Sequence, residues 1–185
     1  MNIRSRSDLI NYLNQGNRAK YLFFWGHQKP KSGVSKTCLS QWYDAAFELD
    51  GIKYQTAEHY MMAEKARLFG DMTSEEKVIT AITPGEAKKI GRSVKGFDEA
   101  LWLEKRFSIV VAANHGKFGQ NNHLKEFLLG TNNRVLVEAS PLDKIWGIGL
   151  AADDQRAENP NLWKGENLLG FALMEVRSSI SEVNS

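Results

Sequence analysis

Cysteine is almost missing from this chain of 185 residues, which has only Cys38. One cysteine excludes an internal disulfide and any zinc site built from several thiolates, and it is typical of a protein in a reducing compartment. A strong charge of one sign is missing as well, because the formal net charge is only +2. The chain therefore lacks the overall basicity of proteins that bind nucleic acid through bulk electrostatics, although a local basic patch is compatible with this balance.

Long apolar runs are also missing. The first eight residues include basic side chains but no apolar segment behind them, which argues against a secretory signal, and no stretch of 18 apolar residues follows. We therefore expect a cytoplasmic protein with no membrane partner. Hydrophobic residues make up 42% and charged residues 25% of the chain, as in ordinary globular proteins. With no repeat or low-complexity tract, residues 1–185 are expected to form one domain with a core at about 20–180.

Local patterns predict a mainly α-helical α+β fold, with a few short strands packed on a helical core. The expected helices begin near Ser7, Thr56, Thr73, Thr83, Asp98, Asn122 and Leu168. The longest covers about 99–117, and the last is expected to fray from Arg177 onward. The expected strands are 21–25, 134–138 and a hairpin of 47–49 with 52–54. Residues 140–167 form a long connection with little regular pattern, and such loops often have a functional role.

One stretch stands out as chemically informative, the hairpin followed by the helix that Thr56 begins. Thr56 can cap the helix and Gly70 lies where it should end. Glu58 then falls in the first helical turn, where the aligned peptide dipoles favour a negative charge and lower the pKa of a carboxylate. The sequence therefore predicts an ionised carboxylate at a fixed position, although glutamate is also common there for structural reasons alone.

Other residue types with functional potential are spread along the chain. Lysines 29, 31 and 36 follow an aromatic strand and could bind phosphates, or could lie in a solvated loop. The four histidines show no paired ligand spacing and no nucleotide-binding glycine motif is present, so we expect neither a metal nor a cofactor. His59 points about 100° away from its neighbour Glu58, which favours a structural role or support of the site.

Several segments occur in the order seen in the NADAR (YbiA-like) family, over about residues 20–180. They are Phe24-Trp25, 39–43, Tyr54-Gln55-Thr56-Ala57-Glu58-His59-Tyr60, Gly91-Arg92, Trp102, Lys117-Phe118, Trp146-Gly147-Ile148-Gly149 and 165–170. The chain resembles this family, and the resemblance implies an N-glycosidase. Members are associated with hydrolysing ribosyl-amine intermediates of riboflavin biosynthesis, or with removing ADP-ribose from guanine bases of nucleic acid.

The chemistry of N-glycosidic hydrolysis determines which groups an active site must provide. Hydrolysis of a ribosyl C1′–N bond passes through an oxocarbenium-like state, which requires a carboxylate near the anomeric carbon. We expect Glu58 to supply it, and the resemblance implies a part for Trp102. In some members an acidic residue directly follows Trp-Gly, but this chain has Ile148 there. Asp153 or Asp154 could take over that function, or could only cap the next segment.

The remaining predicted site residues would bind substrate. Trp25, Trp102 and Trp146 are candidates for stacking on a base. Arg92 could hold a phosphate, and Asn167 could hydrogen-bond ribose or cap a helix. The full predicted substrate-binding set is Phe24, Trp25, Lys65, Arg92, Trp146, Gly147, Gly149 and Asn167.

Two substrate classes remain open at this point. ADP-ribosylated nucleic acid and a small ribosylamino-pyrimidine phosphate both present a ribose joined to an exocyclic amine, and the lysines after the aromatic strand mildly favour the first. A cognate ADP-ribosyltransferase toxin would be a further partner in that case. The alternative from another class is a non-catalytic module that binds ADP-ribose or a modified base.

Overall fold

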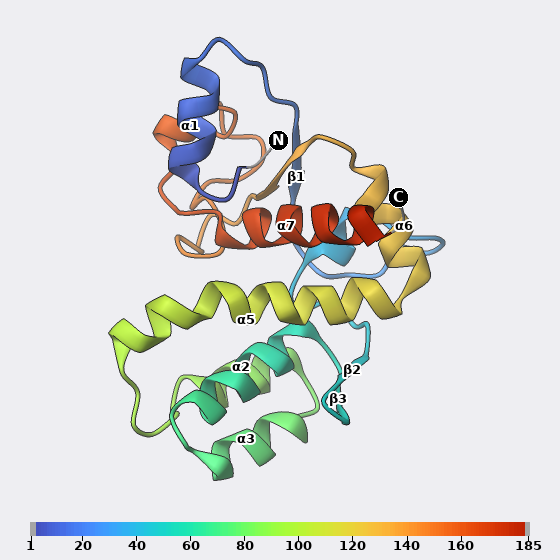
Figure 1. Cartoon of the computed structure of the whole chain (residues 1–185), viewed down its shortest axis with the longest axis vertical. Helices are drawn as coiled ribbons and strands as arrows, with labels where there is room; N and C mark the ends of the chain where they lie inside the picture. The colour runs from blue at the N-terminus through green and yellow to red at the C-terminus, as the bar shows by residue number, and fades with distance from the viewer. Residues whose placement is uncertain (1–2, 184–185) are drawn as a thin grey trace. The chain divides into compact units, whose positions relative to one another are not determined.

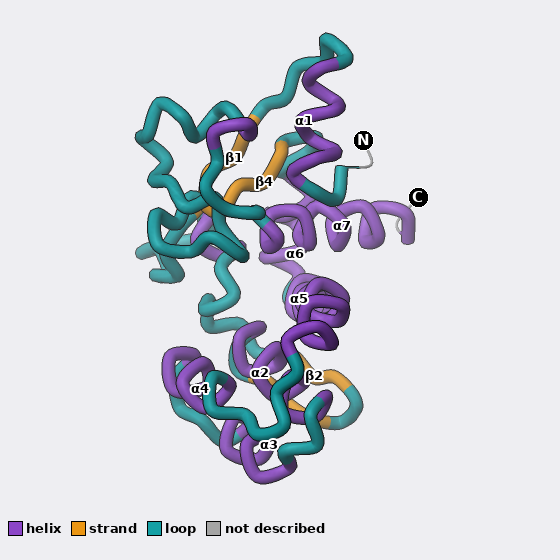
Figure 2. Tube along the Cα trace, turned by 90° about the vertical axis from the view of Figure 1, so that its left-hand side faces the viewer, coloured by secondary structure: helices purple, strands orange, loops and turns teal. Residues whose placement is uncertain are grey.

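A computed structural model describes residues 3–183, and the chain divides into two compact units. Unit 1 comprises residues up to Ser40 and from His123 onward, and unit 2 comprises Gln41–Asn122. Figures 1 and 2 show that helices are the main regular elements of the chain and that the strands are short. The expected mainly helical α+β fold is confirmed.

Unit 2 begins with the expected hairpin. Strands β2 (Phe47–Leu49) and β3 (Ile52–Tyr54) pair antiparallel, with Phe47 opposite Tyr54. Asp50 and Gly51 both have positive φ, 52° and 76°, as a two-residue type I′ turn requires. The rings of Phe47, Tyr54 and Tyr60 pack together, and Tyr54 meets Tyr60 edge to face at 5.0 Å between centroids. The hairpin is thus fixed to the helix that follows it.

Four helices complete unit 2. They are α2 (Ala57–Leu68), α3 (Met72–Ile79), α4 (Pro84–Gly91) and α5 (Glu99–Gln120). Helix α2 packs against the other three, and α5 also packs on β2. At Gly116 of α5 an added Cβ would lie 2.7 Å from the Phe47 ring, so this glycine lets the helix and the hairpin approach closely. Helix α2 is therefore the central element of unit 2.

Unit 1 is built around two parallel strands. Strand β1 (Tyr21–Phe24) pairs with β4 (Val135–Glu138), with Tyr21 beside Val135. Helix α7 (Leu168–Val183) packs on β4, and α1 (Arg6–Asn14) packs on the short 3-10 helix η2 (Pro160–Leu162). The 3-10 helix η1 (Lys36–Leu39) lies in the same unit, as does helix α6 (Asn122–Gly130) from His123 onward. The unit's core includes Phe24, Leu136, Ile148, Leu169, Phe171 and Leu173.

Three helix boundaries differ from the sequence prediction. Helix α1 is capped by Ser5 rather than Ser7, and α3 by Asp71 rather than Thr73. In both cases the cap lies two residues before the predicted one. The Ser5 hydroxyl accepts from the Asp8 N–H and the Asp71 carboxylate accepts from the Ser74 N–H, both at 3.1 Å. Helix α5 extends to Gln120. The caps predicted at Thr56, Thr83 and Asp98 are confirmed.

The prediction that the last helix frays from Arg177 is wrong. Its guanidinium donates from Nη1 to Thr131 Oγ1 at 2.7 Å and to the Arg134 carbonyl at 3.0 Å. Ile180 is buried one turn later. These tertiary contacts, which helical periodicity alone does not reveal, hold α7 in helical form to Val183.

Candidate active site

Glu58 lies in the first turn of α2, as predicted, and its residue is only 3% exposed. The Thr56 side chain caps the helix, accepting from the His59 N–H, and the Glu58 N–H donates to the Gln41 carbonyl at 3.0 Å. An exposed glutamate would have argued for a merely structural role. The burial places this carboxylate inside the protein, where electrostatic interactions are stronger than in water.

Two buried amides stand next to this helix start. Asn114 of α5 donates from Nδ2 to Gln41 Oε1 at 2.7 Å and to the Val110 carbonyl at 2.9 Å. Both residues are more than nine-tenths buried, yet Gln41 Nε2 and Asn114 Oδ1 have no hydrogen-bond partner within residues 3–183. Buried polar atoms normally find partners, so these two atoms are suited to bind a ligand.

A buried ammonium belongs to the same part of α5. Lys117 is fully buried, and its Nζ lies 5.0 Å from the Phe118 ring centroid and 5.6 Å from that of Tyr43. A charge is removed from water only at a high free-energy cost, so its place here calls for a function or a compensating network. Lys117 belongs to the segments that resemble the family, but it was not predicted as a site residue. The available signal was its spacing, one turn after Asn114 and two after Val110, on the buried face.

A second group of predicted residues lies around Lys65, two helical turns after Glu58 on α2. Lys65 Nζ donates to the Gly91 carbonyl at 2.8 Å and lies 4.5 Å from the Phe97 ring centroid and 5.4 Å from that of Trp102. Burial, and then the nearby charge of Arg92, lower the pKa of the Lys65 ammonium. The structure therefore brings Lys65, Arg92 and Trp102 together. Phe97 adds a ring that the sequence did not predict as part of this site.

Glycine at position 91 permits this arrangement. A Cβ there would lie 2.1 Å from Met62 Sδ and 2.9 Å from its Cγ, because Met62 on α2 packs directly against the end of α4. Close approach of the two helices in turn lets Lys65 reach the Gly91 carbonyl. The Gly91-Arg92 pair, predicted from the resemblance, thus has a packing role in addition to any contact with substrate.

In unit 1, the two candidate stacking indoles lie on segments that leave the same end of the strand pair. Trp25 directly follows β1 and is 60% exposed, and Trp146 is half-buried in the segment that follows β4. The strands stay paired at this end, where the Ala139 N–H donates to the Phe24 carbonyl at 2.9 Å. Ligands of open parallel sheets commonly bind at the carboxyl ends of strands. Phe24 itself is buried in the core, away from solvent.

The Trp146-Gly147-Ile148-Gly149 segment is held by backbone hydrogen bonds on both sides. The Ile148 N–H donates to the Glu138 carbonyl, and the Lys164 N–H donates to the Ile148 carbonyl, both at 2.9 Å. A Cβ on Gly147 would lie 2.8 Å from the Glu138 carbonyl oxygen. The glycines therefore let the chain approach its own backbone closely, and contact with substrate through them stays a prediction.

Asn167 clamps this segment to β4. Its Nδ2 donates to the Leu136 carbonyl and its Oδ1 accepts from the Glu138 N–H, both at 2.9 Å. Its own N–H donates to the Gly147 carbonyl at 3.1 Å, and its φ is 56°. Asn167 precedes α7, where helix capping was the alternative, but its side chain bonds the strand instead. Contact with ribose stays a prediction.

The two candidates for the second carboxylate, Asp153 and Asp154, have different surroundings. Asp154 accepts two bonds from the Arg156 guanidinium, at 2.6 and 2.9 Å, which hold the pKa of that carboxyl well below its usual range. Asp153 is exposed. Ile148, which occupies the family's acidic position, is fully buried.

Two other carboxylates lie near this strand end and were not predicted as site residues. Glu138 is the last residue of β4, and Asp143 Oδ1 accepts from the Ile145 and Trp146 N–H groups at 2.8 Å. Asp143 thereby fixes the turn that carries Trp146. A carboxylate three residues before a tryptophan, after Ser140-Pro141, was a readable turn signal.

His59 is explained by packing. It is 1% exposed, with Nδ1 2.8 Å from Thr56 Oγ1 and Nε2 3.1 Å from the Ala81 carbonyl. Burial lowers its pKa, so it is neutral at pH 7. Within residues 3–183, no three His, Cys, Asp or Glu side chains are grouped to hold a metal ion. No helix in this range is long and apolar enough to span a bilayer.

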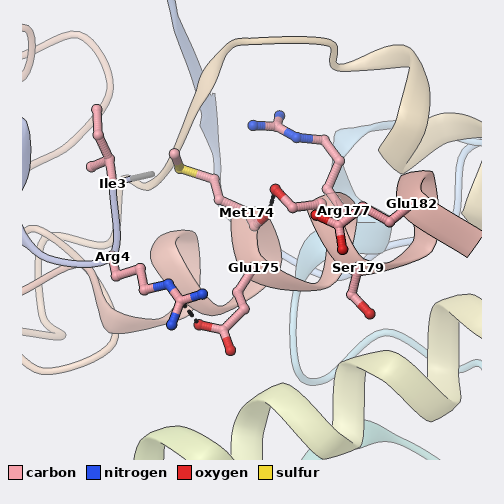
Figure 3. A pocket seen from close by; sticks show the side chains of 8 residues that line it. Ile3, Arg4, Met174, Glu175, Arg177, Ser179 and Glu182 are labelled. Carbon is pink, nitrogen blue, oxygen red and sulfur yellow. Dashed lines mark hydrogen bonds and ion pairs between the residues drawn. The ribbon is translucent and has the colours of Figure 1, made fainter. Parts of the chain in front are cut away.

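One cavity, of about 420 Å³, borders α7 and contains none of the predicted residues. Figure 3 shows Arg4 and Glu175 turned toward each other, with 3.6 Å between Arg4 Nε and Glu175 Oε2, while the Arg177 guanidinium extends away from them. The lining balances the arginines with Glu175 and Glu182. This balance gives the cavity no clear preference for a charged ligand.

Comparison with known proteins bears on both units. The NADAR domain model matches residues 23–181. N-glycosidase R617 of Acanthamoeba polyphaga mimivirus is 44% identical over 163 residues, which cover 85% of this chain and 95% of R617. The chloroplastic riboflavin biosynthesis protein PYRR of Zea mays is 36% identical over 143 residues, which cover 71% of this chain and 20% of PYRR.

The fold has a solved counterpart. The NMR structure of the Escherichia coli protein YbiA matches with a TM-score of 0.70 and 24% identity, over 91% of this chain and 89% of YbiA. By sequence, N-glycosidase YbiA of E. coli strain K12 is 30% identical over 134 residues, which cover 72% of this chain and 75% of YbiA. The structural likeness supports the fold, and the sequence matches support the family.

Proposed function

Because this chain belongs to the NADAR family and is a hydrolase acting on N-glycosyl bonds, we propose that it cleaves a ribosyl C1′–N bond to an exocyclic amine, with the Glu58 carboxylate at the reacting centre. The observation that carries the proposal is the environment of Glu58. The residue is buried at a helix N-terminus, beside two buried amides that offer a free donor and a free acceptor.

The chemistry follows from that environment. As the C1′–N bond breaks, positive charge develops on the ribose, and a fixed carboxylate stabilises it more strongly in a buried site than in water. Glu58 can also orient or deprotonate the attacking water, whose oxygen bonds to C1′. The departing amine takes up a proton, or leaves as an anion stabilised by its ring. The products are the amine and a ribose that has a hydroxyl at C1′ and keeps its phosphates.

The Lys65 group supplies a complementary function. An ammonium held against two aromatic rings, with Arg92 close by, offers paired positive charge for a phosphate and ring faces for a base or sugar. Trp25 and Trp146 are proposed as further stacking groups on unit 1. These roles suit a substrate that contains a base, a ribose and phosphate.

Two substrates meet that description, and we favour ADP-ribose attached to guanine in nucleic acid over a ribosylamino-pyrimidine phosphate. A cognate ADP-ribosyltransferase toxin would then supply the modified base. The name of the Zea mays relative, a riboflavin biosynthesis protein, supports the second substrate. The Lys65-Arg92 pair suits either, since both substrates carry phosphate.

The test is to incubate the wild-type protein with each substrate and identify the released ribose product by mass spectrometry. Release of ADP-ribose from the modified oligonucleotide, at a rate well above release from the pyrimidine, is the expected result. The reverse preference would assign the riboflavin-type substrate. Tight binding of ADP-ribose with no product from either substrate would support a non-catalytic binding module and contradict the proposal.

A further inference from the structure

A cavity at the amino end of the strand pair in unit 1 is lined by positive charge. Its volume is about 440 Å³, and its lining residues are Tyr12, Arg18, Lys20, Asn132, Asn133 and Arg134. Three of the six are cationic and the rest are neutral hydrogen-bonding residues. This composition contrasts with the cavity of Figure 3, in which arginines and glutamates are balanced. A third cavity contains His123 and Glu126, 4.0 Å apart.

The positions of two of these cations are fixed by the strand register. Lys20 and Arg134 directly precede β1 and β4, and the Val135 N–H donates to the Lys20 carbonyl at 2.8 Å. The two residues are therefore neighbours on adjacent strands, which lie about 4.8 Å apart. Like charges placed side by side in this way destabilise a sheet. Within residues 3–183, no acidic side chain pairs with Arg18, Lys20 or Arg134, so an anionic ligand would relieve the repulsion.

The loop that carries Arg134 is rigidly supported. The Asn132 N–H donates to the Leu129 carbonyl at 3.0 Å, and the Arg134 N–H donates to the Thr131 carbonyl at 3.2 Å. Beneath it, the Arg177 guanidinium bonds Thr131 Oγ1 and the Arg134 carbonyl. The loop that lines the cavity is thus held by hydrogen bonds, two of them from the half-buried Arg177 guanidinium.

We propose that this cavity, the β1–β4 basic pocket, binds the phosphate backbone of a nucleic-acid strand. The inference rests on the proposed function, because it names the polymer to which the modified base belongs. Guanidinium, ammonium, hydroxyl and amide groups together are the usual phosphate-binding set of nucleic-acid interfaces. The low net charge of the chain is no obstacle, because the positive groups are concentrated at one place.

Distance along the strands favours a polymer over a small molecule. Lys20 and Trp25 stand at opposite ends of β1, five residues apart, which corresponds to about 16 Å along a strand. Successive phosphates of one B-form strand are about 3.4 Å apart along the axis, so this separation spans about five nucleotides of a duplex and fewer of an extended single strand. A ribosylamino-pyrimidine phosphate cannot reach both ends, whereas a base stacked on Trp25 can belong to a strand that continues to the pocket.

The test uses the full-length protein and a pair of charge-matched triple variants. In R18A/K20A/R134A the pocket loses its three cations. In K53A/K77A/K89A three exposed lysines of unit 2 are removed, so the net charge falls equally. Binding of a fluorescent, unmodified 20-nucleotide single-stranded DNA is measured from 50 to 200 mM NaCl, with and without inorganic phosphate. Hydrolysis of ADP-ribosylated guanosine, as the free nucleoside adduct and within the oligonucleotide, is measured in parallel.

The pocket variant is expected to bind DNA more weakly, and the slope of log affinity against log salt should fall in magnitude by about 2, the value for three lost phosphate contacts on a single strand. Over that salt range the wild type should lose about 18-fold more affinity than the variant. Cleavage of the oligonucleotide should fall while cleavage of the nucleoside adduct is unchanged. The control variant should match the wild type in salt slope.

Equal DNA binding by the two triple variants would overturn the proposal, as would complete displacement of the DNA by millimolar inorganic phosphate, which would indicate a site for free phosphate. Failure of the proposed function is distinguishable from both outcomes. In that case the wild type would cleave neither substrate, while the difference in DNA binding between the variants would remain.

Discussion

Helix α2 and the segment of residues 140–167 each hold predicted functional residues, but by different means. Helix α2 positions Glu58 and Lys65 through its own repeat, with one cap at Thr56 and packing against three helices. Residues 140–167 contain only the short helix η2, and hydrogen bonds to β4 and between parts of the segment hold Trp146 in place. The helix should therefore tolerate small changes of side chain, whereas the segment should depend on glycine and on Asn167.

The largest effect on stability is expected where a helix packs closely against backbone, and the test replaces one glycine in each unit by alanine. At Gly170 in α7 a Cβ would lie 2.0 Å from the Leu136 carbonyl oxygen and within 2.7 Å of both Asn167 amide atoms. Gly170→Ala should therefore lower the free energy of unfolding by roughly 3 kcal/mol, at the upper end for overpacking. At Gly119 in α5 the added Cβ meets nothing within 4 Å. Gly119→Ala should raise stability by up to about 1 kcal/mol, since alanine favours helix.

Chemical denaturation of the two variants provides the measurement. Equal effects of the two substitutions would mean that the close approach of the Leu136 carbonyl to Gly170 does not limit the side chain at that position.

The next largest effect is expected at Asn167. Asn167→Gly keeps a residue that accepts the positive φ but removes both bonds to β4, leaving the Leu136 carbonyl and the Glu138 N–H without that partner. The cost should be about 2 kcal/mol. Asn167→Ala adds backbone strain and should cost about 1 kcal/mol more. Denaturation curves should rank the two in this order, and an alanine variant as stable as the glycine variant would remove the argument from backbone strain.

Because of Lys65, substrate binding should weaken at alkaline pH. Its pKa is lowered, so the ammonium is lost at a lower pH than that of an ordinary lysine. If it holds a substrate phosphate, KM should rise as pH increases through that lowered pKa, with kcat less affected. Lys65→Arg should move the rise to higher pH, because arginine stays charged. A KM–pH profile identical in both proteins would show that the ammonium does not contact the substrate.

His59 should give the smallest effect, on acid stability. Burial lowers its pKa in the folded protein, so below the unfolded value of about 6.5 the unfolded chain binds the proton more readily. Stability should therefore fall as pH decreases from about 6.5 toward the folded pKa. His59→Gln should flatten this part of the curve of melting temperature against pH. An unchanged curve would mean that other groups cause the acid dependence.

Local sequence was enough to predict the hairpin and the start of α2. Asp50-Gly51 specifies the turn and Thr56 the cap, and both signals act over a few residues. The position of Glu58 followed from these two. The burial of Glu58 could not be predicted locally, because α2 packs against α5, which follows it by about 40 residues in the chain.

The clamp by Asn167 could not have been predicted. Its amide bonds residues 29 and 31 positions earlier in the chain, and a capping role was the natural local interpretation. The basic pocket was missed for a related reason. Arg18 and Lys20 are far from Arg134 in sequence, and only the parallel pairing of β1 with β4 brings them together. By contrast, phosphate binding by the lysines at 29, 31 and 36 was predicted only because they are close together in sequence.

The Glu58 carboxylate is proposed to take part in cleavage of the ribosyl C1′–N bond and not to be needed for folding. Glu58→Gln and Glu64→Gln change the same group on the same helix, but Glu64 pairs with Arg67. We would measure kcat, the Kd for ADP-ribose and the melting temperature of both. The account predicts a loss in kcat of roughly 10²- to 10⁴-fold for Glu58→Gln alone, with ligand affinity and melting temperature close to those of the wild type. Comparable kcat in the two variants would contradict it.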